Sequence, residues 1–331
     1  MERPPCEESL ATGRRVYVMS GSPSIDVGPP SPADPKDRFY EAQGLRLHYA
    51  DWGNEAAPPL LLIHGGRDRC RSWDAVARGL QPHFHVMAPD LRGHGDSDWA
   101  KGSSYSLSDY VYDLTCLVRS ASVHRTAIVG HSMGGMIALM YAGAYPDKVS
   151  HLAVLDGVTV LPGMPRTPIH ERFTKWVSEL DKIAERKSRL FRSVAEAAER
   201  ISAHNKRLTP EQALHLASHG VKRNVDGSYS WKFDEYQRAR APYRLSSNDH
   251  IALWSRITCP TLLLRGKESF LPDPETAGVL AHFRRAHLVR LWGLDTGFIT
   301  TNLMRSLGSF AHSSEFDTAK SAGSSRLKSL H

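Results

Sequence analysis

Ser132 lies in a stretch whose residue types suit a serine nucleophile. The pentapeptide GHSMG at residues 130–134 follows a short apolar run and precedes an alanine-rich segment with apolar residues at helical spacing. A strand, a sharp turn and a helix over residues 126–145 would lift the hydroxyl out of a sheet, and the two glycines would leave room for neighbouring backbone. The start of the helix would also point free N–H groups at an oxyanion. The pattern predicts nucleophilic attack by the Ser132 hydroxyl.

The elements around this stretch alternate between strands and helices. Buried or alternating apolar runs predict strands at residues 45–52, 59–63, 83–90, 151–157, 261–266 and 287–291. Start signals predict helices that begin near Ser72, Ser106, Ser193 and Thr209. Helical spacing predicts a further helix at residues 169–183. Together they predict the α/β fold class, with a mostly parallel sheet and helices on both of its faces.

These patterns divide the chain into four parts. Residues 1–38 are rich in Pro, Ser and Gly and show no periodicity, which predicts a disordered leader. Residues 39–157 and 259–291 form the core that contains the sheet. Residues 158–258, where helix signals replace strand signals, form a helical insertion, and residues 292–331 form an atypical tail.

Three motifs, in this order and spacing, resemble those of the α/β-hydrolase superfamily. They are HGG at residues 64–66, DLRGHGDS at residues 90–97 and GHSMGG at residues 130–135. More narrowly, the chain resembles the lidded bacterial hydrolases related to esterases, meta-cleavage-product hydrolases and haloalkane dehalogenases. The resemblance covers roughly residues 39–291. Because relatives that act on haloalkanes and epoxides attack with an aspartate, a serine nucleophile disfavours those two activities.

The resemblance also implies the parts that would surround the nucleophile. The insertion would form a lid, with a substrate pocket between the lid and the sheet. The backbone N–H groups of Met133 and Gly66 would form the oxyanion hole. Several residues of the insertion are candidates for lining the pocket or for ordinary core: Trp176, Leu190, Phe191, Trp231 and Phe233.

Two carboxylates compete for the role of the acid that orients a catalytic base. The superfamily pattern G-x-x-D after the strand that ends at Gly266 places Ser269 where the aspartate would stand. The adjacent Glu268 is therefore one candidate, and Asp273 is a more remote one. Members that have the acid after the preceding strand make Asp156 the other candidate. Without a function, Glu268 would be a solvated loop charge and Asp156 a turn residue.

No histidine occupies the place of the family's base, which follows the last strand in a G-H pattern. This chain reads GLDTGF at residues 293–298. Three histidines of the motif loops are interpreted as structural: His64, His94 and His131. Allowed codons for residues 294–304 read GHWIHHDQLD in the neighbouring frame, which is the segment expected in the family. We therefore hypothesise that a frameshift just before Asp295 replaced the native base and the final helix.

Composition argues against several other classes of protein. The net charge of +7 is spread among acids without a dense basic run, so nucleic-acid binding is not expected. The four cysteines lack metal-ligand spacing and are expected to be free thiols in a reducing, cytoplasmic compartment, with no metal and no other cofactor. No apolar run is long enough to span a membrane. The expected partner is a small-molecule substrate.

Two functions remain open on the sequence. The first is a serine hydrolase that acts on small carboxylic esters, thioesters or carbon–carbon diketone bonds through an acyl-enzyme. The second is an impaired copy of such an enzyme, which lacks the base and only binds a ligand. Loss of the base leaves catalysis by the oxyanion hole and by binding, and lowers the rate on the order of a thousandfold or more.

Overall fold

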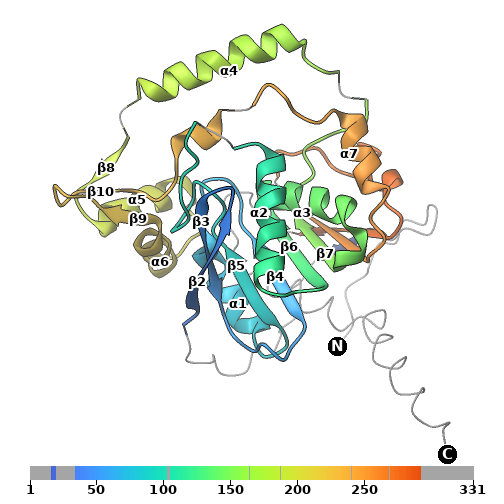
Figure 1. Ribbon diagram of the computed structural model, residues 1–331, viewed down its shortest axis with the longest axis horizontal. Coiled ribbons are helices and arrows are strands. Elements are labelled where there is room, and N and C mark those ends of the chain that lie inside the picture. Colours follow the sequence, from blue (N-terminus) through green and yellow to red (C-terminus); the bar gives the residue numbers. More distant parts are fainter. Residues whose placement is uncertain are drawn as a thin grey trace, which may run out of the picture.

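A mostly parallel sheet of nine strands forms the centre of the computed structural model, which describes residues 16–19, 34–102, 105–163, 165–186, 188–239, 241–267 and 269–291 (Figure 1). The strands lie in the spatial order β1-β12-β11-β7-β6-β4-β5-β3-β2. Their bounds are β1 (Val16–Met19), β2 (Lys36–Ala42), β3 (Leu45–Asp51), β4 (Pro59–Ile63), β5 (His85–Pro89), β6 (Thr126–His131), β7 (Val149–Leu155), β11 (Thr261–Gly266) and β12 (Ala286–Leu291). The pairs β2–β3 and β3–β5 are antiparallel, and the other six pairs of neighbouring strands in this sheet are parallel. The predicted α/β class is confirmed.

Apolar side chains on the two faces of the sheet build two separate cores. In β4, residues 61 and 63 belong to one core, and residues 60 and 62 belong to the other. This division follows from the alternation of side chains along a strand. On the first core lie α2 (Leu107–Ser120), α3 (Met133–Ala144) and α7 (Ser247–Trp254), and on the second lies α1 (Asp74–Leu80). Helices therefore cover both faces, as predicted.

Two predicted capping boxes are present at helix starts. At α2, the Ser106 side chain accepts from the backbone N–H of Asp109, and the Asp109 carboxylate accepts from the N–H of Ser106. Thr209 and Gln212 make the same reciprocal pair at the start of α6 (Pro210–Gly220). Each pair satisfies two N–H groups that a helix start leaves without an intrahelical partner.

The segment at residues 158–258 contains strands as well as the predicted helices. Beside α6 and α7 it forms α4 (Ile169–Ala184) and α5 (Val194–His204). It also forms a small antiparallel sheet in the order β8-β10-β9, from β8 (Leu190–Phe191), β9 (Val221–Arg223) and β10 (Tyr229–Trp231). Strands of two or three residues are too short to show a period of two, so the sequence pattern missed them. Phe191 is buried against α5 and α6, and its ring centroid lies 4.8 Å from that of Trp231, so both belong to a local core.

The prediction of a disordered leader at residues 1–38 is wrong in two places. Val16–Met19 forms β1, which pairs in parallel with β12, and β2 already begins at Lys36. The run VYVM is too short for a periodic signal, but its β-branched and aromatic residues suit a strand that covers the edge of β12. The rest of residues 1–33 and the tail at 292–331, including the hypothesised frameshift, lie outside the described residues.

The described cysteines Cys70, Cys116 and Cys259 are free thiols, as the sequence predicted for them. Cys6 lies outside the described residues. None of the helices in the described part of the chain combines the length and the apolar character needed to cross a membrane.

Candidate active site

Ser132 occupies the corner between β6 and α3, where the sequence predicts a sharp turn. Its backbone has φ 50° and ψ −115°, a conformation that a residue with a Cβ rarely adopts. Such a backbone costs about 1–3 kcal/mol and persists only where the surrounding structure imposes it. Here the Ser132 N–H donates to the carbonyl oxygen of Leu155 at 2.8 Å, which ties the corner to the end of β7. Ser132 as a whole residue is half-buried.

The glycines on either side of Ser132 allow backbone segments to approach closely. A Cβ on Gly134 would lie 2.3 Å from the carbonyl oxygen of Ile63 in β4. A Cβ on Gly130 would lie 2.5 Å from the carbonyl oxygen of Gly134. Neither backbone atom can move aside cheaply, so the strand-to-helix corner requires glycine at both positions.

The loop after β4 lies beside the Ser132 corner. A Cβ on Gly65 would be 3.3 Å from the Ser132 Cβ, which measures how closely the two segments pack. The next residue, Gly66, is exposed, and a Cβ there would lie 3.8 Å from the Met133 Sδ. The structure therefore brings together three residues that the sequence proposed for one site: Ser132, Met133 and Gly66.

Comparison with known proteins identifies the family that shares this corner and loop. The family model described as alpha/beta hydrolase fold matches residues 58–291, which span the sheet from β4 to β12. This chain belongs to the alpha/beta hydrolase family. The match includes the three motifs from which the sequence predicted the family.

The similar proteins include hydrolases of esters and thioesters. A serine hydrolase-like protein of Danio rerio is 28% identical to this hydrolase over 235 residues, which are 67% of the chain and 70% of that relative. An esterase of Mycobacterium tuberculosis is 27% identical over 251 residues, which are 73% of the chain and 78% of the esterase. Among solved structures, the thioesterase domain from the curacin biosynthetic pathway has a TM-score of 0.73 at 26% identity, and covers 83% of this chain and 99% of that domain.

Asp156 is the described carboxylate at the end of the strand next to the Ser132 corner in this hydrolase. It directly follows β7 with φ 44°, and its N–H donates to the carbonyl oxygen of Leu264 in β11 at 2.9 Å. Its Oδ1 accepts from the backbone N–H of Gly266 at 3.3 Å. The half-buried carboxylate therefore lies between the carboxyl ends of β7 and β11.

The other acid candidates have different surroundings. Glu268 lies outside the described residues. Ser269, at the family's usual acid position, is buried, and its Oγ accepts from the N–H of Leu271. Asp273 accepts from the Arg290 guanidinium at 2.8 and 2.9 Å. Burial opposes the ionisation of Asp273, but this contact outweighs burial and holds its pKa below the ordinary value, so Asp273 belongs to a separate ion pair.

His64 has a structural role in the loop of the HGG motif. Its Nε2 accepts from the backbone N–H of Leu91 at 3.0 Å, which requires that the proton sits on Nδ1. Nδ1 in turn donates to the carbonyl oxygen of Gly65 at 2.7 Å. Burial lowers the pKa of His64, so the ring remains neutral. With both nitrogens engaged, His64 connects two motif loops and cannot act as the base.

His94 is expected to make folding sensitive to mild acid. Burial, with a smaller contribution from His64, lowers the pKa of His94 to about 3. As the pH falls below about 6.5, the unfolded chain takes up a proton at this position and the folded chain does not, so stability is lost towards low pH. Between pH 7 and pH 5 this group should account for about 2 kcal/mol of lost stability.

The test compares the parent chain with His94→Gln by urea unfolding at several pH values between 5 and 7. The free energy of unfolding should fall less steeply with decreasing pH in His94→Gln. The difference in slope should correspond to about one proton fewer taken up on unfolding. Equal slopes in the two chains would contradict the assignment of a neutral His94.

Residues 232–238, here called the clamp segment, are fixed to the core beside the DLRGHGDS motif. The Tyr105 hydroxyl donates to the Asp234 carboxylate, and the Lys232 Nζ contacts the Asp96 carboxylate at 2.7 Å. The Asp234–Tyr105 contact is buried. Burial, followed by the hydrogen bond to Asp234, raises the pKa of the Tyr105 hydroxyl well above its ordinary value. The clamp segment is therefore held against the core from two sides.

Gln237 in the clamp segment lies next to the proposed oxyanion hole. A Cβ on Gly66 would be 3.7 Å from the Gln237 Oε1, and Met133 also lies beside this position. Residues 66 and 237 are far apart in the sequence, and neither stands in a periodic pattern that would link them. For this reason, nothing in the sequence indicated that Gln237 lies at the site.

Within the described residues, no histidine hydrogen-bonds the Ser132 hydroxyl. The Ser132 corner and its neighbouring loop are thus in place without a described base. The family position for that base falls in residues 292–331, outside the described part of the chain. The arrangement suits acyl transfer to serine, and the rate depends on what accepts the proton.

Proposed function

We propose that this hydrolase acts on small carboxylic esters, thioesters or carbon–carbon diketones through an acyl-enzyme on Ser132. The observation that supports this most strongly is the backbone conformation of Ser132, because strained serine at a strand-to-helix corner presents its hydroxyl to a substrate. The esterase and the thioesterase among the similar proteins support an ester or thioester in preference to other substrates.

In the proposed mechanism, the Ser132 oxygen attacks the carbonyl carbon of the substrate. The carbonyl oxygen becomes an oxyanion, which the backbone N–H groups of Met133 and Gly66 stabilise. The base takes the Ser132 proton during attack and gives it to the leaving group, so collapse of this intermediate releases an alcohol, a thiol or a protonated carbon fragment. An ester remains on Ser132, and water hydrolyses it to the carboxylic acid and free serine. Asp156 or Glu268 supplies the acid that orients a base. The described contacts favour Asp156, because its carboxylate lies at the carboxyl ends of β7 and β11, and β7 is the strand next to the Ser132 corner.

A second candidate function is ligand binding by a catalytically impaired copy. It is supported by the absence of a described histidine that contacts Ser132 and by the sequence GLDTGF where the family has its base. Such a chain would keep the substrate site and lose most of the rate.

A pre-steady-state assay with p-nitrophenyl esters separates the two functions. In the proposed hydrolase, nitrophenolate is released in a burst of about one equivalent per chain, because acylation precedes a slower deacylation. Ser132→Ala should abolish the burst. The control variant Ser255→Ala, which replaces an exposed serine directly after the end of α7, should retain it. A parent chain without a burst, whose steady rate is unchanged in Ser132→Ala, would contradict the hydrolase and favour the ligand-binding copy.

A further inference from the structure

Three metal-ligating side chains meet outside the active site, where α6 packs against the start of α1. Asp74 is the first residue of α1, and His215 and His219 stand one turn apart on α6. The His215 Nε2 lies 3.1 Å from the Asp74 Oδ2, and the centroids of the two imidazole rings are 4.8 Å apart. One ligand atom from each of the three residues lies within 4.8 Å of the others. The three groups therefore lie together in one cluster.

The surroundings of this cluster leave it open to solvent on one side. The Asp74 carboxylate is buried, whereas the His215 side chain is 36% exposed and His219 is half-buried. Histidines four residues apart lie on the same face of a helix, which is the spacing that lets two imidazoles bind one ion. Two imidazoles and one carboxylate with an open side match the ligand set of zinc sites that keep a position for water.

The position of α6 on the core is fixed by contacts that do not involve these ligands. The Arg69 guanidinium donates to the backbone carbonyl of Leu216, which lies between the two histidines on α6. Leu216 and Ala217, on the other face of the same helix, are buried against α5 in the local core of the 158–258 segment. The ligand atoms are therefore brought together by folding alone, and an ion would not have to reorganise the helix.

We propose that Asp74, His215 and His219 form a site for a divalent transition-metal ion such as Zn²⁺ or Co²⁺, with water completing its coordination. Bound there, the ion would join α6 of the 158–258 segment to α1 of the core. The site is separate from Ser132 and its neighbours, and the proposal does not depend on the function proposed for them.

Arg71 is the positively charged residue next to this site that would repel a bound ion. Its guanidinium contacts the Asp74 carboxylate at 2.8–3.0 Å, and its carbonyl oxygen lies 3.3 Å from the His215 Nε2. Carboxylates that bind metals commonly accept hydrogen bonds from a second group, so the contact can persist in the bound form. Its positive charge nevertheless repels the ion, and Arg71→Gln is therefore expected to tighten binding.

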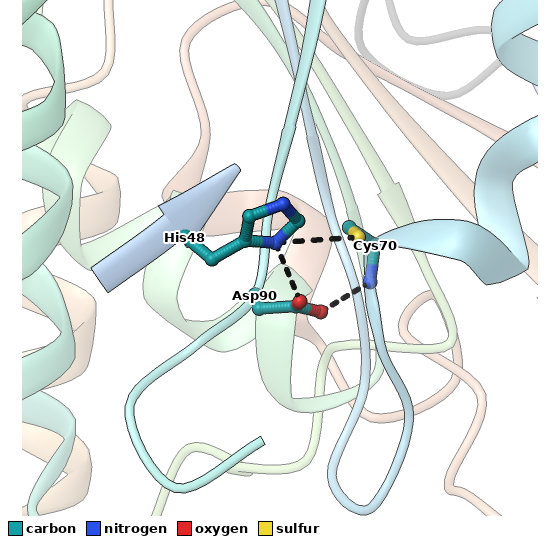
Figure 2. A group of neighbouring side chains, drawn as sticks. All are labelled: His48, Cys70 and Asp90. Atoms are coloured by element: carbon teal, nitrogen blue, oxygen red, sulfur yellow. Dashed lines mark hydrogen bonds and ion pairs between the residues drawn. The ribbon is translucent and has the colours of Figure 1, made fainter. Parts of the chain in front are cut away.

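A second group of metal-ligating side chains provides a matched control. Figure 2 shows His48, Cys70 and Asp90, which are all buried. The His48 ring nitrogens contact Asp90 at 2.8 Å and Asp37 at 3.0 Å, and Asp90 also accepts from the backbone N–H of Cys70 at 2.7 Å. Burial raises the pKa of the Cys70 thiol well above its ordinary value. This group is closed and structural.

The experiment titrates the untagged full chain with Co²⁺, followed by its visible absorption, and with Zn²⁺, followed by calorimetry. The parent chain should bind one equivalent of ion. His219→Ala and the more conservative His219→Gln should weaken binding by roughly tenfold or more. The control variants His204→Ala, an exposed histidine on α5, and Cys70→Ala should bind as the parent does.

A thermal unfolding series supplies a second measurement, because an ion that binds only the folded chain raises its Tm. Zn²⁺ should raise the Tm of the parent and of His204→Ala, and the same Zn²⁺ concentration should raise the Tm of His219→Gln by less. Circular dichroism confirms that each variant is folded. The proposal is overturned if the parent binds no ion, if the His219 variants bind as tightly as the parent, or if Cys70→Ala is the variant that loses binding.

Discussion

In a chain that lacks the base, replacing residues 295–304 with GHWIHHDQLD, the reading of the neighbouring frame, should raise ester hydrolysis on the order of a thousandfold or more. The replacement includes Thr296→His, which restores the family's G-H pattern shortly after β12 ends at Leu291. An imidazole at the family's position would take the proton from Ser132 during attack and return it to the leaving group. The measurement is kcat/KM for p-nitrophenyl esters in the parent chain and in the chain with the replacement.

Two further variants connect that gain to the proposed triad. Ser132→Ala in the chain with the replacement should remove the gain, because nucleophile and base act as a unit. Asp156→Asn in the same chain should lower kcat if Asp156 is the acid, and Glu268→Gln should do so if Glu268 is. A folded chain with the replacement and an unchanged kcat/KM would contradict the placement of the base. Resequencing of the gene independently tests whether the neighbouring frame encodes G-H-W.

Asp113→Ala should lower the free energy of unfolding by about 3 kcal/mol or more. The Arg92 guanidinium donates to both Asp113 oxygens at 2.6 Å, and each residue is only 1% exposed. Burial raises the pKa of Asp113, which reflects the desolvation that the contact with Arg92 offsets. Loss of the carboxylate leaves a buried cation whose nearest other carboxylate, Asp109, is 3.9 Å away. Urea unfolding followed by circular dichroism measures the loss.

The double variant Arg92→Met with Asp113→Leu provides the control for this prediction. Replacement of both charges by apolar side chains of similar size is often nearly neutral, because neither charge is left unpaired. The double variant should therefore recover most of the stability that Asp113→Ala loses. If the double variant is as unstable as Asp113→Ala, the cost comes from lost packing in the loop of the DLRGHGDS motif and not from an unpaired charge.

Local signals explain which parts of the fold the sequence predicted. The capping box of Ser106 and Asp109 joins residues three apart, so its two members can be recognised in a short window. The corner at Ser132 is likewise bounded by glycines two residues away on each side. The buried strands β4 and β11 appear as short apolar runs for the same reason. In each case the interacting groups lie within one stretch of chain.

Contacts between distant residues explain what the sequence did not predict. Gln237 meets the loop at Gly66 only because the clamp segment is attached to the core through Asp234 and Tyr105. In the same way, Asp74 and His219 meet only after α6 docks on α1. The choice between Asp156 and Glu268 also stayed open, since both follow the ends of adjacent parallel strands and the sequence alone does not rank them.

The clamp segment and α4, both in the 158–258 segment, differ in how they are attached to the core. The clamp segment is joined to the core by a buried hydroxyl–carboxylate contact, whereas α4 has no buried residue and lies apart from the sheet at the top of Figure 1. If the 158–258 segment forms the lid that the resemblance implies, we expect that lid to open by displacement of α4, while Gln237 stays beside Gly66. Bulky acyl groups of the proposed substrates would then be admitted or rejected at a movable boundary, and the reacting carbonyl would meet the same fixed residues each time.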